Sequence, residues 1–354
     1  MNFVLLDPAE FRKFADENPF KSFYQTLEIA KLRESNGWTA YYFGVKQNGN
    51  IIAASLVVAK PTFLGKSLYY APGGPLLDYE NASLVDFFFK HLKRYAKSHN
   101  GYLLHIEPYY ELIERDRDGK IVKNGFDHRS ALQNLRRAGF QSLPEPDEPK
   151  YAFVVDFAGR TSEQIFKDFK QNTRNLVHRA ERSGVKIREL GKEELGIFKQ
   201  ITESTSNRRH FEDKSLSYYE KMYDLFHKRG EVKFMVAEAN GLPISAAMFM
   251  LYGDEVTYLF SGSEEKYMKE YNAQYLIQWH MIKYAADHHF KRYNFYGIRG
   301  LPDPSSPDYG IYRFKKGFDS TKNGHVTELL GAYELPINSA FYHLHQLLHK
   351  LKHH

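Results

Sequence analysis

A β-hairpin signature occurs twice in this chain, and the repeat restricts the fold more than any other feature of the sequence. An Asn-Gly dipeptide separates two apolar runs in residues 44–54, and a second one does so in residues 236–246. Both turn residues tolerate a positive φ, which suits the twist of paired strands, so each copy predicts a hairpin. Similar elements follow both copies, which indicates two related domains.

The elements after each hairpin come in the same order. We expect a strand at 68–70, a helix at 84–98 and a strand at 102–106 in the first half, and their counterparts at 256–260, 272–288 and 292–296 in the second. Hairpin, strand, helix and strand form the core of the acetyltransferase-type (GNAT) fold. We therefore predict an α/β (α+β) protein built as a tandem of two acetyltransferase-like domains.

The length of the chain agrees with two domains, because 354 residues are enough for two separate cores. An acidic, proline-rich stretch at 145–149 has the composition of a connector. We place the first domain at 1–147 and expect residues 328–354 to join it. The second domain is predicted to span 148–327.

The absence of cysteine excludes disulfides, thiolate metal sites and a cysteine nucleophile, and it favours the cytoplasm. No apolar run reaches the roughly 20 residues of a membrane helix, and residues 1–19 lack the apolar core of a signal peptide. We expect a soluble cytoplasmic monomer. His345 and His349 lie one helical turn apart within a helix expected at 338–351, but no carboxylate lies at a useful spacing, so we predict no metal.

The net charge of +6 is concentrated in one predicted helix at 161–183. Thr161 and Gln164 form a capping box at its start, and Gly184 follows its end. Its polar face carries the candidate phosphate-binding residues Lys167, Lys170, Arg174, Arg179 and Arg182. A solvated charged face is the alternative interpretation, and a membrane surface is another polyanion that such a helix can meet. The excess of positive charge favours a phosphate-rich partner.

Several chemistries lack their motifs. The chain has no Gly-x-x-x-x-Gly-Lys-Ser/Thr phosphate loop, no Gly-x-Ser-x-Gly elbow and no His-Glu-x-x-His pair. An acetyltransferase needs a glycine-rich turn that holds the coenzyme A pyrophosphate at a helix N-terminus. Residues 267–273 contain no glycine, and the turn at 73–75 contains a proline, which removes one N–H donor. We therefore expect neither coenzyme A nor any other cofactor.

Four segments resemble the Fem-type (FemABX) aminoacyltransferases, namely residues 25–30, 70–75, 170–176 and 274–279. The resemblance extends over essentially the whole chain. It implies a tandem GNAT fold and the transfer of an amino acid from aminoacyl-tRNA to the lysine amine of a peptidoglycan precursor pentapeptide. No heptad run occurs between residues 188 and 258, so the chain looks like the short FemX form of the family, which lacks a coiled-coil arm.

The resemblance also assigns roles to residues. Phe314 and Lys315 match a Phe-Lys pair at the tRNA-end site, where a protonated Lys315 stabilises the oxyanion or donates to the leaving oxygen. The neighbouring Lys316 is expected to be an exposed cation. Glu107 matches an acid near the acceptor amine, with a structural ion pair as the alternative role.

The candidates that bind the precursor are Arg33, Lys214, Tyr218 and Tyr258. Lys214 replaces an arginine of the family, which keeps the charge but loses the two-pronged donor. Phe260 stands where the family has a tyrosine. The basic helix is then the expected contact with the tRNA acceptor stem, whose phosphates are recognised by shape and charge.

Two other functions stay open at this point. The first is an acyl-coenzyme A-dependent N-acyltransferase on the same scaffold. The second is a noncatalytic RNA-binding or cell-wall scaffold protein. For the main hypothesis the transferred amino acid is glycine, alanine or serine, and the acceptor is UDP-MurNAc-pentapeptide or lipid II. A lipid-linked acceptor would bring the protein to the inner face of the membrane.

Overall fold

The computed structural model describes residues 1–144 and 148–344. Contacts within the chain divide it into two compact units. The first unit consists of residues 1–114, 123–150 and 328–354, and the second of residues 115–122 and 151–327. Part of the predicted connector at 145–149, the end of the helix expected at 338–351, and the pair His345 and His349 lie outside the described residues.

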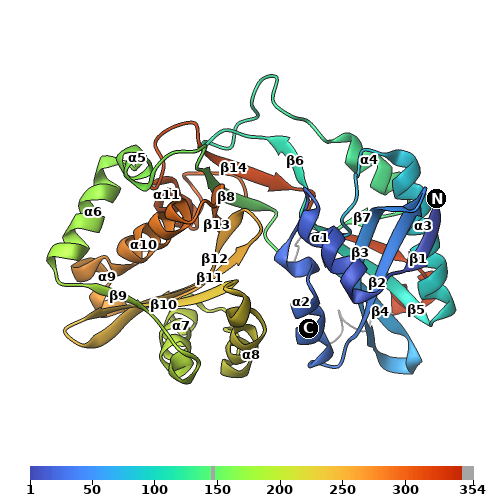
Figure 1. Cartoon of the computed structure of the whole chain (residues 1–354), viewed down its shortest axis with the longest axis horizontal. Coiled ribbons are helices and arrows are strands. Elements are labelled where there is room, and N and C mark those ends of the chain that lie inside the picture. Colours follow the sequence, from blue (N-terminus) through green and yellow to red (C-terminus); the bar gives the residue numbers. More distant parts are fainter. Residues whose placement is uncertain (145–147, 345–354) are drawn as a thin grey trace. The chain divides into compact units, whose positions relative to one another are not determined.

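The first unit contains a sheet of seven strands. In sheet order they are β1 (Asn2–Leu5), β2 (Thr39–Gln47), β3 (Asn50–Pro61), β4 (Ser67–Gly73), β5 (Gly101–Pro108), β15 (Tyr333–Pro336) and β7 (Gln141–Ser142). Two helices, α1 (Pro8–Glu17) and α2 (Leu27–Glu34), cover one face of the sheet, and α3 (Ala82–Ser98) and α4 (Ser130–Arg137) cover the other (Figure 1).

The core of the first unit lies between α3 and the sheet. Val85, Phe88, Phe89 and Leu92 are all buried, and their spacing gives α3 one continuous apolar stripe. This stripe packs on inward-facing strand residues such as Phe43. The expected order of strand, helix and strand after the first hairpin is confirmed.

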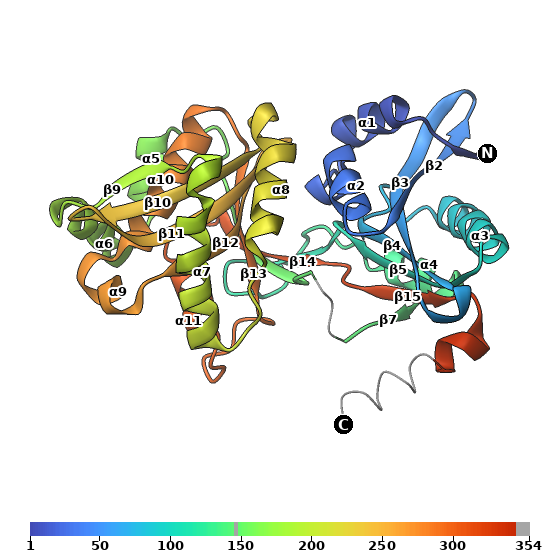
Figure 2. The same cartoon turned by 90° about the horizontal axis from the view of Figure 1, so that it is seen from below.

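The second sheet has eight strands. In sheet order they are β6 (Glu111–Glu114), β14 (Gly324–Leu329), β8 (Tyr151–Asp156), β13 (Arg292–Ile298), β12 (Glu255–Ser263), β11 (Leu242–Tyr252), β10 (Val232–Ala239) and β9 (Lys186–Glu189). Four helices, α5 (Ser162–Asp168), α6 (Gln171–Arg182), α9 (Glu265–Tyr271) and α10 (Ala273–Asp287), lie on one face, and α7 (Leu195–Arg209) and α8 (Leu216–Phe226) lie on the other (Figures 1 and 2).

The two hairpins that define the repeat are present, as predicted. Asn48 and Gly49 have φ values of 50° and 83°, and Asn240 and Gly241 have values of 52° and 77°. Both central residues of each turn are therefore left-handed, as a two-residue hairpin requires. The register also shifts at the same distance before each turn, between residues 45 and 46 and between residues 237 and 238. The two copies thus share an irregularity as well as a pattern.

The predicted basic helix at 161–183 is wrong in one respect, because the structure breaks it into α5 and α6. Phe169 adopts an extended ψ of 148°, and its ring is fully buried against Trp279 and Phe318. The next amide, that of Lys170, donates to Gly317 O at 2.9 Å. This hydrogen bond takes the Lys170 amide out of the helical pattern, so a new helix, α6, begins at residue 171.

The segment 312–318, which contains the candidates Phe314 and Lys315, is mostly helical and belongs to α11 (Tyr309–Lys316). Strand β14 ends before Gly331 and strand β15 begins after it. Among the described residues, no helix is long and apolar enough to cross a membrane.

Candidate active site

The parallel strand pairs of the two sheets differ in length. In the first unit, β4 and β5 pair from Ser67 opposite Gly101 to Gly73 opposite Pro108. In the second unit, β12 and β13 pair only through the three positions that begin with Glu255 opposite Arg292. Both strands continue past that point, so they separate toward their carboxyl ends. Ligands of α/β sheets bind beyond such ends, so the carboxyl end of β13 is a candidate ligand-binding position.

Lys315 lies against the separated part of β13. The register between β13 and β8 shifts after Asn294, and Tyr296 has a positive φ of 61°, which turns carbonyl groups out of the regular ladder. The Lys315 side chain comes from α11 and is only 6% exposed. Its Nζ donates to Tyr296 O at 3.2 Å and to Gly297 O at 2.5 Å.

Burial lowers the pKa of Lys315 from its ordinary value to about 7, because the ammonium form loses hydration. The two hydrogen-bond acceptors of its Nζ are neutral carbonyl groups, which do not offset that loss as a carboxylate would. An amine with a pKa near neutrality can give and take a proton at physiological pH. This is the environment of an acid, a base or an oxyanion donor, and the predicted role of Lys315 in transfer stays a prediction.

Phe314 forms an aromatic wall beside the lysine. It is half-buried, and its ring centroid lies 5.0 Å from that of Tyr275 and 5.3 Å from that of Phe318. Lys316 does not match the expected exposed cation, because its side chain is only 14% exposed and forms an ion pair with Asp118. The structure therefore orients three consecutive residues of α11 toward three different neighbours.

The structure brings Glu107 and Arg33 together in the first unit. Glu107 is buried, and its Oε2 accepts from the Tyr70 hydroxyl at 2.5 Å while its Oε1 accepts from the Glu148 amide at 3.2 Å. The guanidinium of Arg33 lies 5.3 Å from the Tyr70 ring centroid and 5.7 Å from that of Trp38. One tyrosine thus contacts both predicted residues.

Burial alone would raise the pKa of Glu107, but the nearby His105 imidazole and the hydrogen bond from Tyr70 outweigh it and hold the pKa below its ordinary value. His105 lies 3.7 Å from Glu107 Oε1 and 3.8 Å from Glu334 Oε1. Burial opposes the charged imidazole, yet the two carboxylates raise the pKa of His105 to about 9. Tyr70, His105, Glu107 and Glu334 thus form a buried network in which the Glu107 carboxylate is ionised.

Sequence analysis missed Tyr70, His105 and Glu334. One signal was available, because His105 and Glu107 stand two residues apart on a strand and therefore share a face. Tyr70 also lies within a segment that carries the family resemblance. Glu334 could not have been found, since only the pairing of β15 with β5 brings it opposite His105.

The remaining precursor-binding candidates lie in the second unit on opposite faces of the sheet. Exposed Lys214 stands 5.9 Å from the Tyr218 ring, which meets Phe260 edge-on at 6.2 Å on the side of α7 and α8. Tyr258 instead stacks on Phe249 at 5.6 Å. A register shift between β11 and β12 reverses its side relative to Phe260. The structure therefore does not bring Tyr258 to Lys214 and Tyr218.

Tyr258 has its own polar neighbours. Its hydroxyl donates to Ser261 Oγ at 2.5 Å and to Gln274 Oε1 at 3.4 Å. Burial raises the pKa of Tyr258 to about 12, so it is a neutral hydrogen-bonding group. Tyr258 lies on the α10 side of the sheet, where Phe314 packs against the same core.

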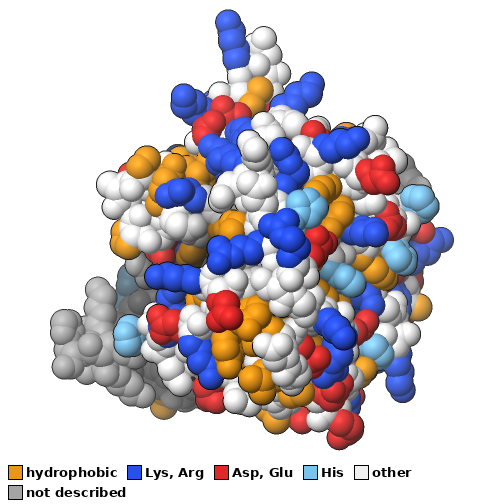
Figure 3. All heavy atoms as spheres, turned by 90° about the vertical axis from the view of Figure 1, so that its left-hand side faces the viewer, with side chains coloured by type: hydrophobic (Ala, Val, Ile, Leu, Met, Phe, Trp, Pro, Cys, Tyr) orange, Lys and Arg blue, Asp and Glu red, His pale blue; other side chains and the backbone are white. Residues whose placement is uncertain are grey.

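Four of the five predicted phosphate-binding residues are exposed, namely Lys167, Lys170, Arg179 and Arg182. Figure 3 looks onto the side of the second unit that carries α5 and α6, and lysine and arginine side chains are spread over it. Arg174 is different, because its guanidinium donates to Lys167 O at 2.7 Å and to Phe169 O. It satisfies carbonyl groups at the end of α5, so its observed contacts are structural.

The glycine turn of the first unit is filled by the protein itself. Gln25 is fully buried and donates through Nε2 to Pro72 O at 2.6 Å and to Leu56 O at 3.1 Å. A Cβ added at Gly74 would lie only 2.5 Å from Cδ of Gln25. At the corresponding place of the second unit, residues 265–271 form helix α9 directly before α10. Neither place has a glycine-rich loop that is open to a pyrophosphate.

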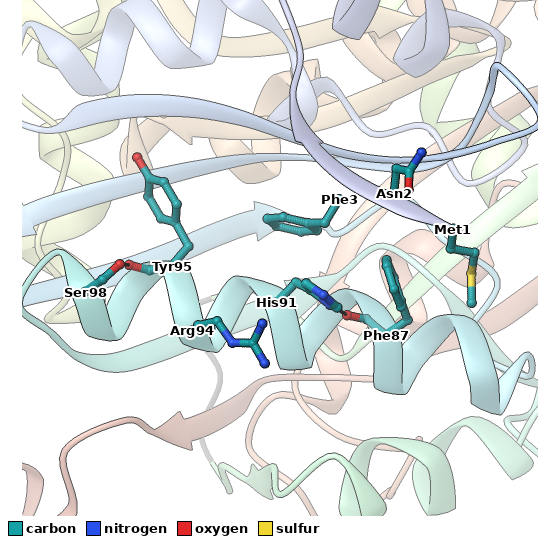
Figure 4. A pocket seen from close by; sticks show the side chains of 8 residues that line it. All are labelled: Met1, Asn2, Phe3, Phe87, His91, Arg94, Tyr95 and Ser98. Atoms are coloured by element: carbon teal, nitrogen blue, oxygen red, sulfur yellow. Dashed lines mark hydrogen bonds between the residues drawn. The ribbon is translucent and has the colours of Figure 1, made fainter.

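A hollow of about 470 Å³ lies between β1 and α3 (Figure 4). It is lined by Met1, Asn2, Phe3, Phe87, His91, Arg94, Tyr95 and Ser98, and no predicted site residue is among them. Within residues 1–144 and 148–344, no group of three histidine or carboxylate side chains could hold a metal ion.

The fold defines a class of protein, the chains built from two GNAT-type domains. A solved structure of FemX has a TM-score of 0.81 at 20% identity and covers 97% of this chain and 99% of its own. A tandem GNAT protein from the clavulanic acid biosynthesis pathway has a TM-score of 0.55 at 10% identity, covering 95% of this chain and 98% of its own. At these identities the two matches establish the fold.

The sequence establishes the family. The FemAB family model matches residues 6–241 and 238–350. Aminoacyltransferase FemA of Staphylococcus aureus strain N315 is 30% identical over 422 aligned positions, which cover 99% of each chain. The chain belongs to the FemAB family and is an aminoacyltransferase. The 422 positions exceed the 354 residues of this chain by 68, so that relative has at least 68 residues without a counterpart here.

Proposed function

We propose that this aminoacyltransferase moves glycine, alanine or serine from aminoacyl-tRNA to the lysine amine of a peptidoglycan precursor pentapeptide, either UDP-MurNAc-pentapeptide or lipid II. The observation that carries the proposal is the buried Lys315, with its pKa near 7, beside the separated strands of a FemAB-family chain. We further propose that the protein acts as a monomer, in the cytoplasm or at the inner face of the membrane.

The reaction needs an amine, an activated ester and a proton donor. The neutral lysine amine of the acceptor attacks the ester carbonyl, and the carbonyl π electrons move to oxygen in a tetrahedral intermediate. The intermediate then collapses, the bond to the ribose oxygen breaks, and that oxygen takes a proton while the new amide nitrogen loses one. An ammonium at Lys315 can stabilise the oxyanion or supply the proton to the ribose oxygen. No covalent enzyme intermediate is required.

Lys315 suits this role better than an exposed lysine. A lysine with its ordinary pKa stays protonated at pH 7 and is a poor proton donor, whereas a pKa of about 7 gives similar amounts of both forms. Its hydrogen bonds to the two β13 carbonyl groups also fix the direction of the amine. Phe314 would then exclude water from the ester.

The proposed acceptor group is the network around Glu107 in the first unit. An ionised carboxylate attracts the acceptor ammonium, and its lowered pKa suits Glu107 to binding this group. Arg33 contacts two neighbouring aromatic rings and would bind a phosphate or carboxylate group of the precursor. Exposed Lys214 and half-buried Tyr218 are the proposed further contacts, with Tyr258 as a separate one.

The proposed RNA contacts are the exposed cations of α5 and α6, with Lys167 and Lys170 at the junction and Arg179 and Arg182 in the last turns of α6. Such residues bind phosphates with little dependence on sequence, and binding weakens as salt rises. This is suitable for an enzyme that recognises the acceptor stem of a tRNA by its shape.

The test combines donor and acceptor in one assay. The protein is incubated with radiolabelled glycyl-, alanyl- or seryl-tRNA and either UDP-MurNAc-pentapeptide or lipid II, with acetyl-coenzyme A as an alternative donor. The proposal expects label on the precursor from at least one aminoacyl-tRNA and none from acetyl-coenzyme A. Transfer to neither precursor, or transfer only from acetyl-coenzyme A, would contradict it. Sedimentation with vesicles that contain lipid II tests the membrane contact.

A further inference from the structure

Residues 115–122 form a compact turn that belongs to the second unit, although they follow β6 of the first unit in the sequence. The Asp116 side chain accepts from the amides of Asp118 at 2.8 Å and of Lys120 at 2.9 Å. Arg115 Nη1 donates to Gly119 O at 2.7 Å, and the backbones of Arg115 and Ile121 form an isolated antiparallel β-bridge. The segment therefore has internal hydrogen bonds of its own.

This turn is attached to the rest of the second unit at two places besides α11. The amide of Val326 in β14 donates to Asp116 O at 3.2 Å. A Cβ added at Gly119 would lie 2.7 Å from Cδ of Pro302, so the glycine lets the turn approach the loop before α11. Gly119 also has a φ of 77°, which disfavours any other residue there.

The turn contacts α11 and the residues just after it through four side chains, two from the turn and two from the helix. The Tyr312 hydroxyl donates to Arg117 O at 2.7 Å, and Lys316 forms an ion pair with Asp118. Arg117 Nη2 donates to Asp319 O at 2.6 Å and to Lys316 O at 3.3 Å. A guanidinium thus satisfies carbonyl groups at the carboxyl end of the helix, where a cation is also favourable to the helix dipole.

These contacts lie on a different side of α11 from the proposed catalytic group. Tyr312 and Lys316 are four residues apart and share one face, whereas Lys315 is turned from them by about 60° and about 100° around the helix, respectively. On its own face Lys315 reaches the β13 carbonyl groups, and Phe314 meets Tyr275 of α10. A helix of eight residues has little stability alone, so its position depends on such contacts.

We propose that residues 115–122 brace α11, and that Arg117 is a positioning residue that keeps Lys315 buried against β13. This inference rests on the proposed function only for its kinetic consequence. Without the guanidinium, the Lys316 carbonyl at the end of α11 and the Asp319 carbonyl just after it lose their donor, and the ion pair of Lys316 loses its neighbour. The helix end then loosens, and Lys315 becomes hydrated.

The competing role for Arg117 is direct contact with a phosphate of the RNA. Lys170 lies close enough to Arg117, Lys316 and Arg313 for these cations to lower its pKa, after burial, which is the largest cause. A basic cluster of this kind would also attract RNA. The two roles predict different kinetic changes, because an RNA contact affects KM for tRNA whereas a positioning residue affects kcat.

The experiment uses the full chain with Arg117→Ala, Arg117→Lys and Tyr312→Phe. Lys120→Ala is the matched control, since Lys120 is an exposed cation of the same turn. Lys315 is acylated with a small amine-reactive reagent from pH 6 to pH 11, and its modification is followed by peptide mass spectrometry. This readout does not need transferase activity. Single-turnover transfer and KM for aminoacyl-tRNA are measured in parallel.

In the wild type, Lys315 should react slowly and with a midpoint near its pKa of about 7. Arg117→Ala should increase the rate at high pH and move the midpoint toward 10.5, the ordinary value, while kcat falls between about 10- and 100-fold. Arg117→Lys and Tyr312→Phe should give smaller changes in the same direction, because each removes part of the contact. Lys120→Ala should match the wild type.

Two results would overturn the proposal. The first is an unchanged midpoint and rate of Lys315 modification in Arg117→Ala, whatever its transferase activity. The second is a higher KM for tRNA with an unchanged Lys315 titration, which would assign Arg117 to RNA binding. If Arg117→Ala does not fold, Arg117→Lys and Tyr312→Phe decide by the same readouts. An inactive wild type with the expected Lys315 titration shifts would refute the proposed function but not the brace.

Discussion

Replacing Lys315 by methionine should change how the stability of the second unit depends on pH. Methionine has a similar length and no charge, so it removes the cost of burying an ammonium. The folded pKa of Lys315 is about 7 and the ordinary value is 10.5. Between these values the unfolded chain binds more protons than the folded chain, so this lysine makes the free energy of unfolding rise with pH. The destabilisation is complete below pH 7 and disappears above pH 10.5.

The size of the effect follows from the same two values. From pH 7 to pH 9 the folded lysine loses about half a proton, while the unfolded lysine loses almost none. Integrating the proton difference at about 1.4 kcal/mol per unit gives a rise of about 2 kcal/mol in the free energy of unfolding of the wild type. Lys315→Met lacks this rise, so its stability relative to the wild type should decrease by about 2 kcal/mol over that interval.

Comparing the variant with the wild type is necessary because His105 acts in the opposite sense. Its pKa is raised from 6.5 to about 9, so its stabilisation is complete below pH 6.5 and is lost as pH rises through 9. The loss from pH 7 to pH 9 is also about 2 kcal/mol. When the whole chain unfolds in one transition the two groups nearly cancel, because His105 lies in the first unit and Lys315 in the second, and only the difference between variant and wild type then isolates Lys315.

The assay can be confined to the second unit. The chain has two tryptophans, of which Trp38 lies in the first unit and Trp279 packs on Phe166 and Phe169 in the second. In a Trp38→Phe background, urea unfolding followed by tryptophan fluorescence reports the second unit alone. Lys322→Met serves as the control, because Lys322 is exposed in the same unit. An identical difference between variant and wild type at pH 7 and at pH 9 would refute a pKa near 7 for Lys315.

Three other predictions follow from particular contacts. His105→Gln should lower the free energy of unfolding of the first unit by about 2 kcal/mol more at pH 7 than at pH 9 in urea titrations, and an equal change at both would contradict the raised pKa. Charge reversal at Lys170 and Arg179 should weaken tRNA binding and reduce its salt slope in filter-binding assays, whereas an unaltered slope would remove them from the RNA site. Gly74→Ala should destabilise the first unit by roughly 1 to 3 kcal/mol, since the new Cβ would meet the Gln25 carboxamide; unchanged thermal unfolding would show that the turn can adapt.

The repeated parts of the fold could be predicted from the sequence because their signals are local. An Asn-Gly turn needs two residues with positive φ, and both copies have them. The apolar stripe of α3 is visible in the spacing of its residues. Such features depend on a few neighbouring positions, so they do not require knowledge of the rest of the chain.

Other parts of the site depend on contacts that are distant in sequence. The basic helix is broken at Phe169 because its ring and the following amide find partners at residues 279, 317 and 318. A one-residue shift between β11 and β12 reverses the side on which Tyr258 lies. The capping role of Arg174 depends on that helix break and could not be read from charge alone.

The candidate site residues also differ in whether a local sequence signal or a distant contact identifies them. The family resemblance predicts Lys315 and Glu107 as site residues. The structure adds their surroundings, which are two carbonyl acceptors for the lysine and the Tyr70 and His105 side chains for the glutamate. The turn at 115–122 carried no motif, because its importance arises only from its attachment to α11.

The most direct test of the central claim is single-turnover transfer from aminoacyl-tRNA to the peptidoglycan precursor by the wild type, Lys315→Met and Lys322→Met. Each protein is saturated with donor and acceptor, and its fold is checked by thermal unfolding. The account predicts that Lys315→Met remains folded and transfers about 100-fold or more slowly, as for the loss of an oxyanion donor, while Lys322→Met equals the wild type. A folded Lys315→Met protein with near-normal transfer would contradict the account.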